Sequence, residues 1–436
     1  NFVNFMGYYT WVAAGEEGLE GVQVTEWDEP QAVIGSYLHR YAYPDYFKNH
    51  QSNKQELRES HRHHGVGGST QSIQMRGEYL YTAAGSGGFR VYDIANVANK
   101  GFSERIVTSP VSPLGQDTHV GSKNATGVAL PTNMPVAPFK EQLPENLETP
   151  MHALYHYAFI SDSEEGLIVV NVDTLQDGEP RNNFLERALT WNEGGILTGA
   201  RFITLAGARA FIGTDDKIVS LDLDDPLKPR VESVWPAHRP TGVAVQFRYA
   251  FMTDAKGFHV IDITSPSEPR VVTKASIALP EARNVYVART YAYVAGGKDG
   301  VVIIDVERPE QPRLYMKYTA EGEISDTYDV KVASTNASLF GYVADGRNGL
   351  FVLQLTDPDR VPGFYGFSPN VKPMVIARKH MAGPALAISK PLDRDRAVDE
   401  TGHQVSVLGR IGSRPFNLEE MKRMFLTQKG KVWTVD

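Results

Sequence analysis

The sequence has no cysteine among its 436 residues. This excludes disulfides, thiolate-bound metals, thiol nucleophiles and covalently attached c-type haem within the chain. It also has no surplus of positive charge, because 44 lysine and arginine residues face 52 aspartate and glutamate residues, for a net charge of −8. A nucleic-acid partner is therefore not expected, since such binders carry a basic face. No run of about 18 apolar residues is present, so we expect no transmembrane segment.

Catalytic motifs are also scarce. The sequence has no G-x-S-x-G elbow, so it indicates no hydrolase serine. Its Asp-Gly and Asn-Gly pairs lack the ligand set of a calcium loop and are interpreted as hairpin turns. The glycine-rich stretches at 85–88 and 296–297 also fall in turns, where glycine tolerates a positive φ. The sequence therefore leaves enzyme activity open and favours a protein without it.

A hairpin-like unit recurs along the chain. Its clearest copies are YAYVAGGKDGVVIID at 291–305, YAFMTDAKGFHVID at 249–262 and AFIGTDDKIVSLD at 210–222. Looser copies lie at 342–354, 157–171, 79–93 and 9–26, which makes seven. Each copy has β-branched and aromatic runs on both sides of a turn rich in glycine and aspartate. That pattern is typical of a β-hairpin.

The spacing of these units predicts the fold. The later copies follow one another at about 40–50 residues, which is the period of a propeller blade. Further strands are predicted before the hairpins, at 241–246, 283–287 and 328–332, and after them, at 230–234, 270–273 and 313–318. Four strands in each of seven units predict an all-β, seven-bladed β-propeller over residues 1–370. We expect residues 1–6 to supply the innermost strand of the first blade.

The Tyr-Ala-Tyr-Val-Ala…Gly-Val-Val-Ile-Ile-Asp-Val…Pro…Pro pattern resembles the LVIVD-repeat propellers of bacteria and archaea. The resemblance covers roughly residues 8–370 and is closest in blades five to seven. It implies a secreted or surface-associated protein, because members of that family look periplasmic or extracellular. Some of them lie beside multihaem c-type cytochromes or are fused to them. The resemblance therefore implies a multihaem cytochrome as one kind of partner.

The repeat is interrupted by two insertions and followed by a tail. The first insertion, at about 40–68, carries Tyr41, Tyr43, Tyr46 and Phe47, and the second, at about 131–156, is rich in proline. Residues 371–436 do not follow the repeat, and Asn417-Leu-Glu-Glu420 has the pattern of a helix start with a capping box. Leu418, Met421 and Phe425 would form an apolar stripe on that short helix. We expect this C-terminal extension to pack on the propeller or on a partner.

Histidines are the candidate chemical residues. Five of the twelve, His61, His63, His64, His119 and His238, fall in segments predicted to enter the innermost strands of blades two, three and five. Glu193, Glu281, Arg283, Asp326 and Asp329 occupy the corresponding segments of blades four, six and seven. These segments would converge at one mouth of the ring, where imidazoles and carboxylates could bind copper, zinc or iron. The alternative is that the histidines are solvated or form hydrogen bonds between blades.

Three hypotheses of function follow. The first is a non-catalytic scaffold of an extracytoplasmic protein complex, with an electron-transfer assembly as a setting that the resemblance implies. The second is a metal-dependent redox enzyme that uses the histidine-lined site. Apart from a metal ion, the sequence indicates no particular cofactor. The third is a carbohydrate or small-ligand-binding propeller that uses exposed aromatic residues. Since the chain begins at Asn1 rather than methionine, we interpret it as processed or as part of a longer protein.

Overall fold

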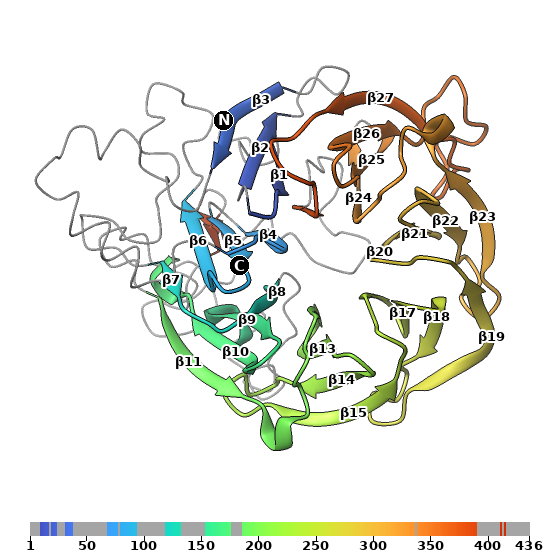
Figure 1. Cartoon of the computed structure of the whole chain (residues 1–436). Helices are drawn as coiled ribbons and strands as arrows, with labels where there is room; N and C mark the ends of the chain where they lie inside the picture. Colours follow the sequence, from blue (N-terminus) through green and yellow to red (C-terminus); the bar gives the residue numbers. More distant parts are fainter. Residues whose placement is uncertain are drawn as a thin grey trace, which may run out of the picture.

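Seven four-stranded antiparallel sheets are arranged in a ring around a central axis (Figure 1). The structure is a computed structural model, and it describes residues 9–16, 19–23, 31–37, 68–76, 79–93, 118–131, 153–175, 185–335, 338–389, 410–411 and 414–415. The predicted seven-bladed β-propeller is confirmed. Within these residues the helical segments are short 3₁₀ turns, and none is long and apolar enough to cross a membrane.

The first three blades contain the two insertions. From the axis outward, blade one consists of β28 (Ala387–Ile388), β1 (Tyr9–Ala13), β2 (Leu19–Gln23) and β3 (Gln31–Tyr37). Blade two consists of β4 (Ser72–Arg76), β5 (Tyr79–Ala83), β6 (Phe89–Asp93) and β7 (His119–Val120). Blade three consists of β8 (Ala125–Ala129), β9 (Tyr157–Asp162), β10 (Gly166–Asn171) and β11 (Glu186–Trp191), with η4 (Ala153–His156) and η5 (Asp173–Leu175) in its connections.

The remaining four blades follow the repeat closely. Blade four consists of β12 (Phe202–Ala206), β13 (Arg209–Gly213), β14 (Lys217–Asp222) and β15 (Arg230–Pro236), and blade five of β16 (Gly242–Gln246), β17 (Tyr249–Asp254), β18 (Gly257–Asp262) and β19 (Arg270–Ala278). Blade six consists of β20 (Val285–Ala288), β21 (Tyr291–Ala295), β22 (Val301–Asp305) and β23 (Arg313–Tyr318), and blade seven of β24 (Asp329–Thr335), β25 (Ser338–Ala344), β26 (Leu350–Gln354) and β27 (Met374–Lys379). The turns η7 (Glu193–Gly195) and η8 (Ala320–Gly322) connect successive blades, and β29 (Arg410–Ile411) pairs with β30 (Arg414–Pro415) outside the ring sheets.

The ring is closed by a strand from the C-terminal part of the chain. β28 occupies the innermost position of blade one, where Val12 pairs with Ile388 and Ala13 with Ala387. The prediction that residues 1–6 fill this position is therefore wrong, and those residues lie outside the described part. The predicted boundary at residue 370 is also too early, because β27 completes blade seven and β28 completes blade one. Sequence pattern missed β28 because it is only two residues long.

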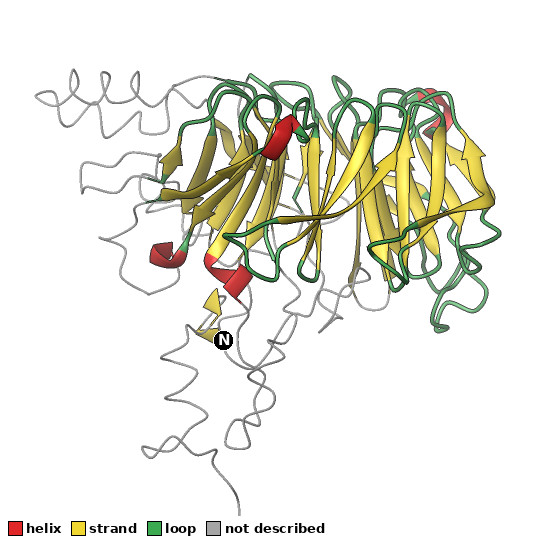
Figure 2. Cartoon of the chain, turned by 90° about the horizontal axis from the view of Figure 1, so that it is seen from below, coloured by secondary structure: helices red, strands yellow, loops and turns green. Residues whose placement is uncertain are grey.

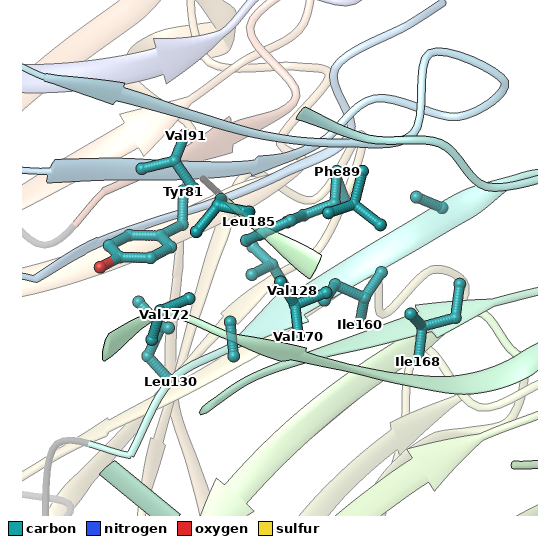
Figure 3. Close-up of a cluster of buried hydrophobic side chains, with 14 of the residues drawn as sticks. Tyr81, Phe89, Val91, Val128, Leu130, Ile160, Ile168, Val170, Val172 and Leu185 are labelled. Atoms are coloured by element: carbon teal, nitrogen blue, oxygen red, sulfur yellow. The ribbon is translucent and has the colours of Figure 1, made fainter. Parts of the chain in front are cut away.

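The inner strands are buried on both faces because each blade packs between two others. Every residue of β21 is buried, as are the first four residues of β22, whereas the outermost strand β23 is largely exposed. Figure 3 shows one of the clusters between blades, where Tyr81 and Phe89 of blade two meet Val128, Ile160 and Val170 of blade three. Burial of each such side chain contributes about 1.5–3 kcal/mol. The hydrophobic core is thus divided among the interfaces between blades.

Backbone bridges join the hairpins of several blades to the next blade. Gly85 exchanges two backbone hydrogen bonds with Ala125, both of 2.9 Å, and Gly297 and Gly346 form the same kind of bridge with Thr327 and Ala385. These bridges place the loop before each innermost strand beside the preceding hairpin. Figure 2 shows that the connections gather on two opposite faces of the ring.

Side chains link the innermost strands of neighbouring blades. Those strands belong to different sheets, so no backbone ladder joins them. The hydroxyl groups of Thr126 and Thr204 donate to the carbonyls of Ala200 (3.0 Å) and Val243 (3.1 Å) in the following blade. Similar bonds, in chain order, join Gln74 to Leu130, Gln246 to Arg289, Asn284 to Asp329, and Asp329 to Ile388. Polar groups near the axis therefore hold the blades together.

At Gly300, the β21–β22 hairpin of blade six lies close to the outer strand β23. The φ of Gly300 is +68°, and a Cβ there would lie 2.3 Å from the carbonyl oxygen of Tyr318. Gly207 has a φ of +58° but open space around a Cβ. We expect Gly207→Ala to lower the free energy of unfolding by about 1 kcal/mol through backbone strain alone. Gly300→Ala should cost at least about 1 kcal/mol more, as measured by chemical denaturation. Equal losses would contradict this account.

The closure strand gives a second prediction. The backbone N–H of Ile388 donates to Asp329 Oδ2 at 3.0 Å, so Ile388→Pro removes a bond between blades seven and one and leaves a buried carboxylate oxygen without this donor. Hydrogen exchange of β1 should accelerate more than exchange of β17, which lies on the other side of the ring. Equal acceleration of hydrogen exchange in β1 and β17 would contradict the view that β28 stabilises mainly blade one.

Candidate functional site

The predicted histidine cluster is only partly within the described residues. His61, His63 and His64 lie outside them. His119 was expected in the loop entering blade three, but it belongs to β7, the outermost strand of blade two. Its side chain is buried, with Nε2 placed 2.9 Å from the carbonyl oxygen of Gly87. His119 therefore holds the blade-two hairpin instead of lying at the axis.

His238 lies where it was expected, in the connection from blade four to blade five. Its ring is exposed, and Nε2 contacts the ammonium group of Lys256. A positive charge at that nitrogen opposes the binding of a metal cation. Within the described part of the chain, no three histidine, aspartate or glutamate side chains are grouped to hold a metal ion. Glu193 is exposed in η7 at a different connection.

Asp326 belongs to an ion-pair cluster at the junction of blades six and seven. Arg283 donates to Asp326 Oδ1 at 2.8 Å and to Glu281 Oε2 at 3.2 Å, and its guanidinium lies 4.0 Å from the centre of the Tyr328 ring. These side chains keep between a quarter and two fifths of their surface exposed, so the ion pairs contribute little stability. The arrangement orients Arg283 between two blades.

The residues predicted to bind a partner lie outside the described part of the chain. They are Tyr41, Tyr43, Tyr46 and Phe47 of the first insertion and Leu418, Met421 and Phe425 of the tail. The same holds for the predicted helix that begins at 417. These assignments stay predictions.

Three exposed aromatic side chains were not singled out by sequence reasoning. Phe247, Tyr365 and Phe367 keep 93%, 88% and 80% of their surface exposed. Phe247 forms the two-residue turn between β16 and β17 and has a φ of +53°. The same turn position is Gly207 in blade four, where positive φ is ordinary, and Arg289 in blade six, where φ is +55°. A bulky aromatic residue in this conformation is a backbone outlier.

The three aromatic residues share one face of the ring. The segment that holds Tyr365 and Phe367 connects β26 to β27 and is fastened to the turn of blade six by the hydroxyls of Ser368 and Thr290. The neighbouring turn of blade five is joined to blade six by a 3.2 Å bond from Gln246 Nε2 to the Arg289 carbonyl. We call Phe247, Tyr365 and Phe367 together the aromatic face. It is opposite the face that carries Arg283 and His238.

A polar cluster on the other face is centred on Asp254. This carboxylate is 2% exposed and ends β17. Oδ1 accepts bonds from the backbone N–H groups of Lys256 (2.7 Å) and Gly257 (3.2 Å), and Oδ2 accepts one from His238 (3.1 Å). Asp254 therefore holds its own hairpin and the connection from blade four.

Two further side chains extend this cluster outward. His259 Nε2 lies 2.9 Å from Asp254 Oδ1, and His259 Nδ1 lies 2.9 Å from the Ser276 hydroxyl. Ser276 is exposed on β19, directly opposite His259 on β18. The hydrogen bonds thus run from a buried carboxylate through an imidazole to a hydroxyl group at the surface.

The environment of Asp254 favours its charged form. Burial by itself raises the pKa of this carboxyl group, but the bonds from the Lys256 and His238 amides and from His259 together hold the pKa below its ordinary value. The folded chain therefore binds this proton less readily than the unfolded chain. Asp254 contributes stability that is present above the ordinary carboxyl pKa and is lost as the pH falls through the lowered value.

Asp254→Asn tests this contribution. At neutral pH we expect a loss of about 1–3 kcal/mol in the free energy of unfolding, because an amide group would face the His238 N–H. The difference from the unaltered chain should shrink as the pH falls below about 4, where the aspartate of the unfolded chain is protonated. Asp216→Asn is the control, since that side chain is 77% exposed and should change stability little. A pH-independent difference would contradict the electrostatic account.

Comparison with known proteins supports the repeat. The LVIVD repeat family model matches residues 67–108, 241–275 and 281–320, which lie in blades two, five and six. No curated protein matches the chain.

Several solved structures are similar in shape at low identity. The Cps50 (Swd1) β-propeller domain of Myceliophteria thermophila has 12% identity and a TM-score of 0.45, covering 75% of this chain and 91% of that one. Apo AztD from Citrobacter koseri has 9% identity and a TM-score of 0.39, covering 87% and 96%. A putative 6-phosphogluconolactonase from Bacteroides uniformis has 8% identity and a TM-score of 0.43, covering 72% and 82%.

The sheet topology and the matched repeats both indicate a β-propeller. Seven four-stranded blades are present, and the three matched segments coincide with blade hairpins and their neighbouring strands. The chain is a seven-bladed β-propeller, and three of its blades carry segments that match the LVIVD repeat.

Proposed function

We propose that the chain is an interaction scaffold that binds a protein partner through the aromatic face. The observation that carries this proposal is Phe247, which keeps a fully exposed aromatic ring at a turn position where its backbone is strained. A left-handed conformation costs about 1–2 kcal/mol in a residue with a Cβ. Such strain persists at functional sites, where another requirement outweighs stability.

The chemistry of the face fits a protein partner. Aromatic side chains are enriched at the centres of protein interfaces, because they bury a large area at a small cost in conformational entropy. Tyr365 adds a hydroxyl group that can form a hydrogen bond at the edge of a buried ring. On the basis of the family resemblance alone, we place the protein outside the cytoplasm and name a multihaem cytochrome as one class of partner.

Phe247→Asn separates the role in binding from the role in folding. Asparagine adopts positive φ more readily than phenylalanine, so the free energy of unfolding should stay the same or rise by up to about 1 kcal/mol. The mass of the natively purified particle should meanwhile fall toward that of the single chain in light scattering, because loss of a central aromatic contact costs about 2 kcal/mol or more of binding. A native particle that is a single chain before any substitution would overturn the proposal.

Exposed apolar residues at the outer rim supply a matched control. Val231, Val271 and Leu314 are 43%, 56% and 47% exposed on the outermost strands of blades four to six. Their replacement by serine removes apolar surface without touching the aromatic face. The particle mass should then be unchanged. A loss as large as that of Phe247→Asn would assign the interaction to the rim instead.

A further inference from the structure

His259 is bonded through Nε2 to Asp254 and through Nδ1 to Ser276. A carboxylate only accepts hydrogen bonds, so His259 Nε2 carries the proton that it donates to Asp254. When the ring carries no second proton, the lone pair of Nδ1 accepts the bond that the Ser276 hydroxyl donates at 2.9 Å. This is the arrangement of a nucleophile, a base and a group that orients the base. Both distances lie within the range that proton transfer requires.

The fold needs the aspartate but not the other two residues. Asp162 of blade three and Asp345 of blade seven are also buried and accept backbone N–H bonds from their own hairpin or the preceding loop. In the other blades, different residues face each other at the position of His259 and Ser276. The corresponding pairs are Ile168–Thr190 in blade three, Val219–Val234 in blade four, Val302–Lys317 in blade six and Phe351–Arg378 in blade seven. Among these described blades, only blade five combines a histidine with a hydroxyl group.

The surroundings leave the hydroxyl group accessible. Ser276 is exposed on the edge strand β19, while 17% of the His259 side chain and 2% of the Asp254 side chain are exposed. His259 lies on the side of blade five that faces blade four, because its neighbours Phe258 and Val260 face blade six. The Lys256 ammonium group is on the same hairpin and supplies positive charge near this edge. A carbonyl compound can therefore approach Ser276 from solvent.

We propose that Ser276 is a nucleophile that accepts acyl groups from small activated esters, with His259 as its base and Asp254 orienting that base. Ser276 Oγ attacks the ester carbonyl carbon while its proton passes to His259 Nδ1. The carbon–alkoxy bond then breaks, and the leaving alcohol takes the proton from His259. Water attacks the acyl-serine in the same manner and restores the hydroxyl group, so the overall reaction is ester hydrolysis. This activity goes beyond the scaffold function and does not depend on it.

The test is covalent labelling of the full chain. Incubation with p-nitrophenyl acetate or a fluorophosphonate should modify one site, which peptide mass spectrometry places at Ser276. Ser276→Ala should abolish the label, and His259→Gln should slow labelling by about 100-fold or more, the usual contribution of a general base. Ser267→Ala is the control, because that exposed hydroxyl forms no bond to an imidazole among the described residues. Labelling of Lys256 alone, or an unchanged rate in His259→Gln, overturns the proposal.

A second variant separates reactivity from folding. Because the chain has no cysteine, Ser276→Cys introduces a single thiol. Its alkylation by iodoacetamide should be faster with His259 present than in the double variant Ser276→Cys/His259→Gln, since imidazole promotes formation of the thiolate. Thermal unfolding of each variant shows whether the blade is intact. Equal alkylation rates in two folded variants would show that His259 does not activate position 276.

Discussion

Every blade of this fold relies on closure of the ring. Each blade buries both of its faces, so a missing strand in blade one would expose the neighbouring face of blade seven as well. The cluster at this junction combines Val12 and Val22 of blade one with Tyr342 and Val352 of blade seven and Ile388 of the closing strand. A two-residue strand thus completes an interface whose stability comes from side chains of two much longer segments. Its backbone is held on one side by β1 and on the other by Asp329.

The same constraint determines what the polar residues near the axis do. Innermost strands of adjacent blades cannot exchange ladder bonds, because they belong to separate sheets. Threonine, glutamine, asparagine and aspartate side chains supply the missing links, and buried donors and acceptors there are costly unless they are paired. The polar side chains that form these links along the axis are therefore engaged in holding blades together. This explains why a position near the mouth is weak evidence for a metal ligand.

Function in a repeat protein is best sought where one blade departs from the others. Most hairpins follow a shared plan of apolar strands and a turn, and Asp162, Asp254 and Asp345 serve that plan in three blades. Blade five departs from it at two positions. The bulky Phe247 occupies a turn position of positive φ that is Gly207 in blade four and Arg289 in blade six. A histidine opposite a serine, His259 and Ser276, occupies the position where blades three, four, six and seven have other pairs. The fold requires neither residue, so each points to a further role.

The class of fold, the number of blades and the limits of most inner hairpins can be predicted from the amino-acid sequence alone. Periodic apolar runs around glycine and aspartate turns are local signals, and the predicted outer strand at 313–318 coincides with β23. The strand that closes the ring became visible only in the folded chain, because pairing of β28 with β1 joins two segments far apart in the sequence. It likewise placed His119 in an outer strand and brought Asp254, His259 and Ser276 into one chain of hydrogen bonds. These three residues lie on three successive strands, so their contact depends on the register of β17, β18 and β19. The β18–β19 connection and the register shift after His259 determine that Ser276 faces His259. The spacing of the residues in the sequence does not reveal this register.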